Sequence, residues 1–106
     1  MAKYLLRASL TTEGARGMLK EGGTARKRVV EGAVAAAGGT IEAFYYAFGE
    51  DDVYVLADLP DHASAAAVSL TVSGSGAVRA STAVLITPEE MDQASQKSID
   101  YRPPGA

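Results

Sequence analysis

Residues 40–61 read TIEAFYYAFGEDDVYVLADLPD and predict two strands, a turn and a helix start in succession. The aromatic and β-branched residues of 40–48 and 53–59 favour strands, and the polar stretch between them has the composition of a hairpin turn. Pro60 ends the second strand because it lacks a backbone donor for the sheet ladder. Asp61, directly after it, is a preferred helix N-cap. The segment therefore predicts a β-hairpin followed by a helix.

The flanking segments complete a pattern of strands and helices. Residues 2–10 alternate between the two sides of a strand, and Thr24 stands before a one-sided apolar pattern that predicts a helix over 25–37. The predicted order is strand 2–10, helix 25–37, strand 40–48, strand 53–59, helix 61–73 and strand 77–87. This order is typical of a ferredoxin-like α+β fold, a four-stranded antiparallel sheet with two helices on one face.

Two weaker helical segments and a tail lie outside this pattern. Residues 13–23 contain four glycines, which predict a short and easily interrupted helix. Pro88 followed by two acids predicts a last short helix over 88–97, because Pro suits the first helical position and acids suit the first turn. We assign residues 1–97 to a single domain and residues 98–106 to an extended C-terminal tail.

The composition limits both the core and the chemistry. Of the 106 residues 47% are hydrophobic, but 20 of these are Ala, so we expect a thin core. The chain has no Cys and one His, which excludes disulfides, iron–sulfur clusters and a multi-histidine metal centre, and we expect no cofactor. A net charge of −3 argues against a nucleic-acid partner, because phosphate binding requires a concentrated positive field. No segment resembles a signal peptide or a membrane span, so we expect a cytoplasmic protein without a membrane partner.

Alternate residues along each of the four predicted strands point to opposite faces of the sheet, which divides the strand residues into two sets. The first set contains no charged residue, and we expect it to lie under the helices. Its members are Tyr4, Leu6, Ala8, Leu10, Ile41, Ala43, Tyr45, Ala47, Val53, Val55, Ala57, Leu59, Val78, Ala80, Thr82, Val84 and Ile86.

The second set mixes charges with large apolar side chains. No helix covers this face in a monomer of the predicted fold, and such a contiguous apolar patch is typical of an interface or a ligand groove. Alternatively, the C-terminal helix 88–97 folds back over part of it. The members are Lys3, Leu5, Arg7, Ser9, Glu42, Phe44, Tyr46, Phe48, Tyr54, Leu56, Asp58, Arg79, Ser81, Ala83 and Leu85.

The helix predicted over 61–73 has apolar residues on two sides. The stripe that we expect to pack on the sheet consists of Ala63, Ala66, Ala67 and Leu70. The nearly opposite stripe consists of Ala65, Val68 and Val72. Two apolar sides indicate a helix that is covered on both, although small residues on a surface helix need no cover.

The hairpin and the segments after it resemble a known family. Tyr45–Asp61, with an aromatic strand, a turn, a hydrophobic strand and a Pro-Asp helix start, is similar to the signature of the GYD domain family. Residues 76–79 and 85–90 resemble the end of that family, and the similarity covers roughly residues 3–92. The turn departs from the family at Asp51, which stands where the family has the Tyr that names its motif. The resemblance implies a dimeric α+β barrel, in which two ferredoxin-like sheets meet face to face, but the family is mostly described as of unknown function.

The mixed face holds the residues that we expect to bind a ligand. Arg7 and Arg79 come from strands that are neighbours in the predicted fold, and together they suit a carboxylate or another anion. The two tyrosines of this face would add phenol donors, and either carboxylate would act as a base if burial raised its pKa. Alternatively, the arginines and carboxylates pair with one another across a dimer interface. The candidates are Arg7, Glu42, Tyr46, Tyr54, Asp58 and Arg79.

The turn and the following helix start are expected to have structural roles. Gly49 would supply unusual backbone angles, and Asp52 would accept hydrogen bonds from nearby amides. Pro60 and Asp61 are a strand stop and a helix cap. We expect His62 to be a lone surface histidine rather than an acid or a base.

We therefore expect a homodimer or larger homo-oligomer that binds a small organic molecule, with an anion favoured, in a cavity on the mixed face. The predicted interface residues are Leu5, Phe44, Phe48, Leu56 and Leu85. One alternative is a non-catalytic assembly or regulatory module, whose mixed face is purely a dimer interface. Another is a cofactor-independent enzyme of the monooxygenase or isomerase type, which rests on fold analogy alone. No nucleophile and base, phosphate loop or metal-ligand spacing indicates a particular reaction.

Overall fold

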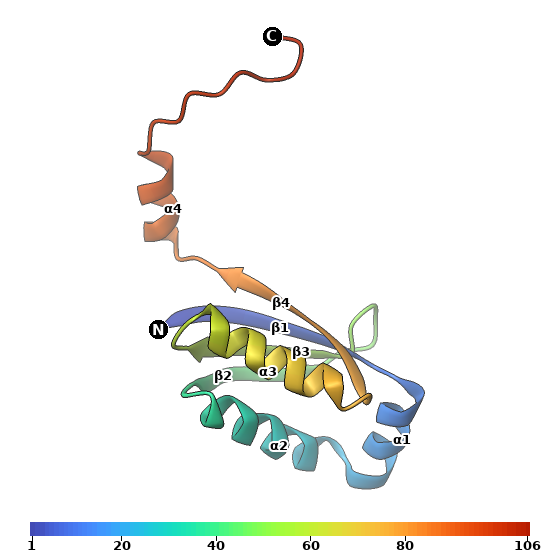
Figure 1. Ribbon diagram of the computed structural model, residues 1–106. Coiled ribbons are helices and arrows are strands. Elements are labelled where there is room, and N and C mark those ends of the chain that lie inside the picture. The colour runs from blue at the N-terminus through green and yellow to red at the C-terminus, as the bar shows by residue number, and fades with distance from the viewer.

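The computed structural model describes residues 1–106 and contains four strands and four helices (Figure 1). The strands are β1 (Ala2–Leu10), β2 (Thr40–Tyr46), β3 (Val53–Leu59) and β4 (Val78–Leu85). The helices are α1 (Thr12–Glu21), α2 (Gly23–Ala36), α3 (His62–Gly74) and α4 (Pro88–Ser95). The predicted order of strands and helices is therefore confirmed.

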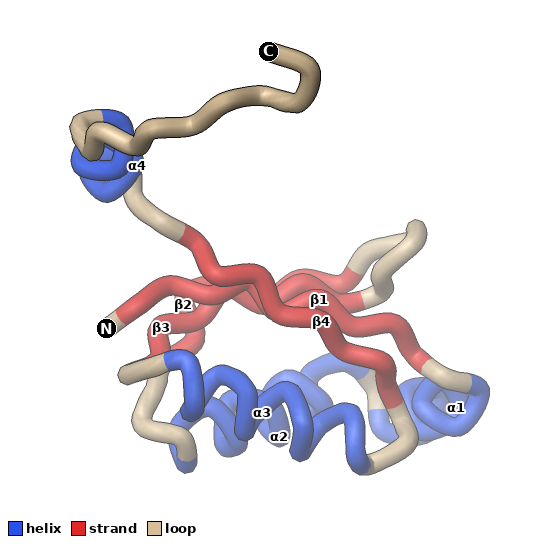
Figure 2. Tube along the Cα trace, turned by 45° about the horizontal axis from the view of Figure 1, so that its top comes forward, coloured by secondary structure: helices blue, strands red, loops and turns tan.

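The four strands form one antiparallel sheet in the order β2-β3-β1-β4. Helices α1, α2 and α3 lie on one side of this sheet, and no helix packs against its other side (Figure 2). The arrangement is the ferredoxin-like α+β fold that the sequence predicts. Below, the covered side is called the helix side and the uncovered side the open face.

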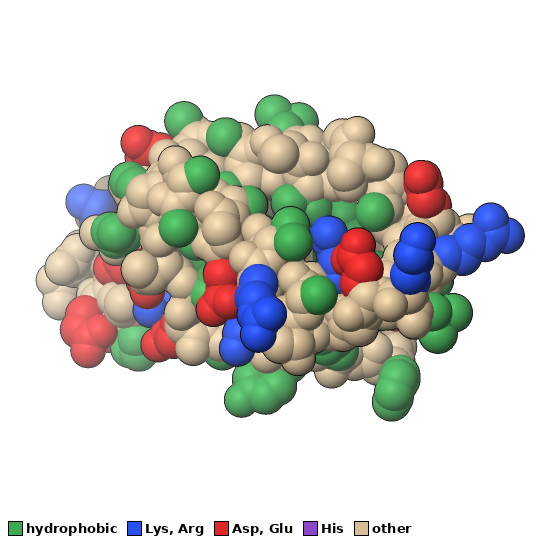
Figure 3. Space-filling view, turned by 90° about the horizontal axis from the view of Figure 1, so that it is seen from below, with side chains coloured by type: hydrophobic (Ala, Val, Ile, Leu, Met, Phe, Trp, Pro, Cys, Tyr) green, Lys and Arg blue, Asp and Glu red, His purple; other side chains and the backbone are tan.

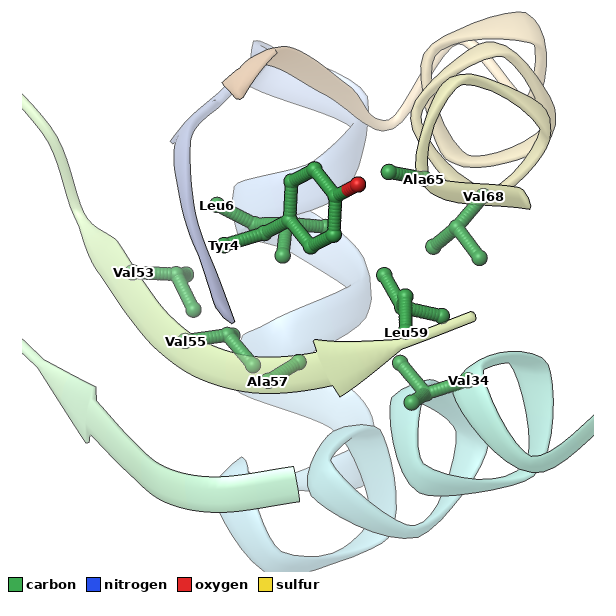
Figure 4. Close-up of a cluster of buried hydrophobic side chains, with 9 residues drawn as sticks. All are labelled: Tyr4, Leu6, Val34, Val53, Val55, Ala57, Leu59, Ala65 and Val68. Atoms are coloured by element: carbon green, nitrogen blue, oxygen red, sulfur yellow. The ribbon is translucent and has the colours of Figure 1, made fainter. Parts of the chain in front are cut away.

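The core lies between the sheet and the helices α2 and α3, and it is small. Only 12 of the 106 residues are buried, and the largest fully buried side chains are Tyr4, Leu59 and Val34. Figure 4 shows side chains of β1 and β3 meeting those of the two helices. The buried cluster consists of Tyr4, Leu6, Val34, Val53, Val55, Ala57, Leu59, Ala65 and Val68.

Polar side chains at three helix starts satisfy backbone donors that a helix leaves free. Thr11 accepts a hydrogen bond from the N–H of Gly14 at 3.1 Å before α1. Asp61 accepts one from the N–H of Ser64 at 2.8 Å before α3, as predicted. Thr87 forms a reciprocal capping box at α4. These caps explain why the helices begin where they do.

The glycine-rich segment 13–23 is less interrupted than predicted. It forms α1, a continuous helix of ten residues. Gly22, with φ of 86°, separates α1 from α2. Because α2 begins at Gly23, Thr24 lies within this helix and not before it as we expected. Because a positive φ favours glycine, Gly22 permits the chain to change direction between the two helices.

A β-bulge in β2 reverses the alternation of this strand. Ile41 pairs with Ala57 of β3, whereas Ala43 pairs with Leu56, so Glu42 is the extra residue. One additional residue moves every later side chain of a strand to the opposite side of the sheet.

The residues after the bulge lie on the faces opposite to those predicted. Phe44 and Tyr46 pair with buried valines of β3 and lie on the helix side, so their predicted place on the open face is wrong. Ala43 and Tyr45 lie on the open face instead of under the helices. The strand ends at Tyr46, and Phe48 lies fully exposed in the turn that follows.

The packing side of α3 is also opposite to the predicted one. Ala65 and Val68 are each only 3% exposed against the sheet, whereas Leu70 is 73% exposed. Val72 packs against the same buried cluster. Two valines bury more apolar area than the alanines of the other stripe, and the single leucine of that stripe remains in solvent.

The chain leaves the sheet after β4. Residues 86–106, here called the C-terminal arm, are exposed throughout, and α4 within this arm has no buried residue. Figures 1 and 2 show the arm projecting from the sheet on the side opposite to α1, α2 and α3. The radius of gyration of 16.9 Å exceeds the value of about 13 Å expected for a compact chain of this length. The alternative in which helix 88–97 folds back over the open face is therefore wrong.

We predict that Gly14→Ala destabilises the protein strongly. A Cβ at Gly14 would overlap the carbonyl oxygen of Ala77, just before β4. We expect the free energy of unfolding to fall by about 2 kcal/mol or more, because overpacking strains the backbone. The matched control is Gly17→Ala in the same helix, where a Cβ meets nothing within 4 Å and the gain is up to about 1 kcal/mol. Urea denaturation measures both variants, and equal effects would contradict the close approach at Gly14.

The bulge leads to a second prediction, which compares the stability effects of substituting two neighbouring aromatic residues. Phe44→Ala is expected to lower the free energy of unfolding by about 2 kcal/mol, because the ring packs against the buried cluster. Tyr45 is 71% exposed on the other side of the sheet, and Tyr45→Ala is expected to cost less than about 0.5 kcal/mol. Thermal unfolding at low protein concentration compares the two. A larger loss for Tyr45→Ala would show that the strand alternates without a bulge.

Candidate functional site

An apolar row crosses the middle of the open face. The strand registers place Ala43 beside Leu56, Leu56 beside Leu5, and Leu5 beside Ala83. All four side chains are half-buried although no helix lies over them (Figure 2). Leu5 and Leu56 are thus on the open face as predicted, and so is Leu85 by its register with Lys3.

A second row, the arginine row, runs beside the apolar row. Here Tyr45 pairs with Tyr54, and Arg7 stands between Tyr54 of β3 and Ser81 of β4. The Nε atom of Arg7 is buried and has no hydrogen-bond partner. A buried donor without an acceptor is unfavourable, so the guanidinium of Arg7 is not fully satisfied within the chain.

The two arginines of the predicted ligand site lie on one face of adjacent strands. Arg7 is paired in register with Ser81, and Arg79 with Ser9, so the arginines are diagonal neighbours across β1 and β4. Arg79 is exposed, and neither arginine forms an ion pair within the chain. The open face therefore has two positive charges that remain available to an anion.

The two predicted carboxylates are bound by a lysine instead. Lys3 Nζ lies 2.9 Å from Asp58 and 3.1 Å from Glu42. The hydrogen bonds that the Lys3 ammonium donates to Asp58, and then to Glu42, raise the pKa of Lys3 above its ordinary value. All three side chains are partly exposed, and ion pairs between exposed side chains add little stability. The single positive charge of Lys3 offsets one of the two negative charges. Both carboxylates contact the lysine, so neither is free to act as a base.

Tyr46 serves the helix side rather than the open face. Its hydroxyl donates to the carbonyl oxygen of Gly23 at 2.7 Å, at the start of α2. Its ring stands edge-on to Phe44, with ring centres 5.3 Å apart. Burial raises the pKa of the Tyr46 phenol above its ordinary value, and the nearby charge of Arg26 opposes this shift. The phenol is therefore a protonated donor that fastens α2 to β2.

The turn after β2 is tied to the end of β1. The carboxylate of Asp52 accepts the N–H of Leu10 at 2.8 Å, which agrees with its predicted structural role. Asp51, in the place of the family tyrosine, accepts a hydrogen bond from the hydroxyl of Ser9 at 3.2 Å. Gly49 has no positive φ, so the expectation of unusual backbone angles there is wrong.

The helix start after β3 contains the other two predicted structural residues. Pro60 follows directly after the last residue of β3. The hydrogen bond from Ser64 holds the pKa of the Asp61 carboxyl below its ordinary value, so this cap is anionic at neutral pH. Both residues have the roles that the sequence predicts.

A small apolar cavity lies on the helix side, between the sheet and the helices. Its volume is about 60 Å³, and its lining includes Leu6, Met18, Val30, Phe44, Val55 and Val72. Figure 3, seen from below Figure 1, shows hydrophobic side chains in a hollow bordered by charged ones. Since an engineered cavity that takes up benzene measures about 150 Å³, this space reflects a loosely filled core.

Two kinds of feature are absent from the chain. No three side chains of the types His, Asp or Glu lie close enough together to hold a metal ion. No helix has the length and apolar character that crossing a membrane requires.

The sheet order, the single helix layer and the uncovered amphipathic face define a ferredoxin-like α+β domain. Residues 4–95 match the family model of the GYD domain, and the chain belongs to the GYD domain family. The match ends with the last residue of α4 and confirms the resemblance seen in the hairpin. Comparisons with curated proteins and with solved structures find no match.

Proposed function

We propose that this GYD domain forms a homodimer through its open face and binds a small organic anion between the two sheets. The observation that carries the proposal is the apolar row, whose leucines have no cover within the chain. A second sheet packed on this face would bury the row, and because each leucine is already half-buried, completing its burial would stabilise the assembly by about 1 kcal/mol. The thin core of the single chain is then completed by its partner.

The C-terminal arm supports the same assembly. It leaves the sheet on the side of the open face, where the second copy would lie (Figure 2). Its exposed apolar side chains, Met91, Ile99 and Tyr101, have no partner within their own chain. A second copy on the open face would lie within reach of this arm and would remove these side chains from water.

The arginine row supports an anionic ligand. Arg7 has a guanidinium without an ion-pair partner, and Tyr54 is its cross-strand neighbour on β3. Arg79 adds a second positive charge on the neighbouring strand. The adjacent apolar row suits the body of an aliphatic or aromatic carboxylate, whose oxygens pair well with a guanidinium. Of the predicted ligand residues we therefore retain Arg7, Tyr54 and Arg79.

A purely structural dimer is the second candidate. It is supported by Lys3, which already pairs with both carboxylates of the face and leaves no base for chemistry. In this case an acceptor of the partner subunit would satisfy Arg7. The two candidates share the interface and differ in whether an added carboxylate binds to the dimer.

The dimer is tested with a charge placed in the apolar row. We expect the wild type to sediment at twice the chain mass of 10.9 kDa, and Leu56→Asp to sediment as a monomer, because an unpaired carboxylate is costly to bury. Tyr45→Asp is a second variant, since Tyr45 is 71% exposed and its loss spares the fold. The control is Leu19→Asp on α1, where the side chain is 89% exposed on the other side. A monomeric wild type, or dimers for both open-face variants, would contradict the interface.

The ligand is tested with benzoate as the probe. At about ten times its dissociation constant, a bound ligand stabilises the native state by about 1.4 kcal/mol. We expect benzoate to raise the Tm of the wild type and not that of Arg7→Met, which keeps much of the chain length but removes the donors. Arg28→Met, on the exposed surface of α2, is the control and should respond like the wild type. A dimer whose Tm does not respond to benzoate would favour the purely structural assembly.

A further inference from the structure

The edge strand β4 is open to pairing along its length. Its eight residues pair with β1 without a register shift, and they include a single charge, Arg79. The other edge strand, β2, is interrupted by the bulge at Glu42. Bulges and charges discourage pairing at a sheet edge, so β4 is the edge that suits an added strand.

The outward backbone groups of β4 belong to its even-numbered residues. Thr11 continues the register of β1 opposite Ala77, and its N–H donates to the carbonyl oxygen of Ala77 at 3.0 Å. Residues of an edge strand direct their backbone groups alternately toward the neighbouring strand and away from it. The N–H and C=O groups that face away from the sheet are therefore those of Val78, Ala80, Thr82 and Val84.

An apolar hollow lies beside this edge on the helix side, between α3 and β4. Its volume is about 430 Å³, and its walls include Leu70 of α3 and Val84 of β4. These two side chains are 73% and 54% exposed. The side chains of a strand added to β4 would point alternately into this hollow and to the open-face side of the edge. The edge therefore suits a strand that is apolar on one side only.

The end of the C-terminal arm has this alternation. Residues 97–102, here called the tail segment, read KSIDYR and lie between α4 and Pro103. Ile99 and Tyr101 share one side of an extended chain and are 80% and 72% exposed. Asp100 lies on the other side. The tail segment is thus an unpaired extended stretch with one apolar side.

The charge of the tail segment agrees with the same orientation. When Ile99 and Tyr101 point into the hollow, Asp100 lies on the open-face side of the edge. Arg79 is exposed on that side and has no ion pair within the chain. Opposite charges on neighbouring strands attract. Because a guanidinium has five donors, Arg79 can contact both Asp100 and the anion of the proposed ligand site.

The length of α4 brings the tail segment to the level of a second copy. Figures 1 and 2 show α4 projecting from the sheet on the open-face side, with the tail segment beyond it. The eight residues of α4 give a rise of about 12 Å, and sheets that pack face to face lie about 10 Å apart. The tail segment therefore begins near the level of the partner's sheet and away from β4 of its own chain.

We propose that the tail segment of each copy binds as a fifth strand to β4 of the other copy, with Ile99 and Tyr101 in the hollow. Its backbone pairs with the outward groups of β4, and its apolar side chains cover Leu70 and Val84. The inference rests on the proposed homodimer and specifies a contact that strengthens it. Since a two-fold dimer repeats each contact, the two copies exchange their tail segments.

Amide hydrogen exchange, followed by NMR on the whole chain, tests the docking of the tail segment. We expect the outward amides of Ala80, Thr82 and Val84 to exchange at least about tenfold more slowly in the wild type than in Ile99→Asp, because a paired edge must open before it exchanges. Ile99 is exposed within its own chain, so this substitution spares the fold. The matched control is Ser98→Asp, which adds the same charge on the other side of the tail segment and should exchange like the wild type.

Mixed dimers distinguish exchange between two copies from folding back within one copy. Ile99→Asp labelled with ¹⁵N is mixed with an excess of unlabelled wild type. We expect slow exchange to return to β4 of the labelled chains, because the tail segment of the wild-type partner reaches across. Fast exchange in the mixture would show that the tail segment contacts only its own β4, and would overturn the proposal.

Fast exchange of the outward amides in the wild type would also overturn the docking site. Equally slow exchange in the wild type and in Ile99→Asp would overturn it too, because another strand, such as β4 of a second copy, would then cover the edge. Sedimentation separates these results from the proposed dimer. A dimer with a free β4 edge contradicts the tail contact alone, whereas a monomeric wild type contradicts the dimer and the exchange together.

Discussion

The bulge at Glu42 determines which side of the sheet receives the aromatic side chains of this chain. It places Phe44 and Tyr46 under the helices, where they extend a core that has few other large side chains. The same extra residue turns Tyr45 toward the open face, and Glu42 itself pairs with Lys3 there. With regular alternation, the helix layer would lose both rings and the open face would gain them. The loosely filled core and the moderately apolar open face both depend on this one insertion.

The short side chains of the helix layer explain why apolar surface remains outside the core. α3 is the helix that packs along β4, and the residues that it buries are Ala65 and Val68. These side chains reach the middle of the sheet but do not extend over its edge. Val84 on the edge strand therefore stays half-exposed, and Leu70 on the outer side of α3 has no neighbour that covers it. The hollow between α3 and β4 thus results from an Ala-rich helix that lies beside the edge strand of the sheet.

Much of the fold follows from local sequence patterns, whereas the features that depend on distant residues do not. The cap at Asp61 and the alternation of β1, β3 and β4 are local, and the structure confirms them. In β2, the residues after Glu42 are apolar or aromatic at odd and even positions alike. The sequence therefore shows no break in the alternation of apolar and polar residues that would mark the bulge. In α3, both stripes are apolar, and only the sheet decides between them. The hydrogen bond between Tyr4 and His62 joins residues far apart in the sequence, so the sequence alone did not reveal a partner for the histidine.

The alternation of the central strand β1 divides its side chains between the open face and the helix side. Its odd residues Leu5 and Arg7 belong to the open face, whereas Tyr4 between β3 and β4 points into the helix side and holds His62. A shift of β1 by one residue would exchange these sets and would remove both the arginine row and the contact between Tyr4 and His62. The hydrogen bond from Leu10 to Asp52, at the far end of the strand, opposes such a shift. The turn that contains Asp51 and Asp52 is bonded to the end of β1. It therefore holds the register that places Arg7 on the open face and Tyr4 on the helix side.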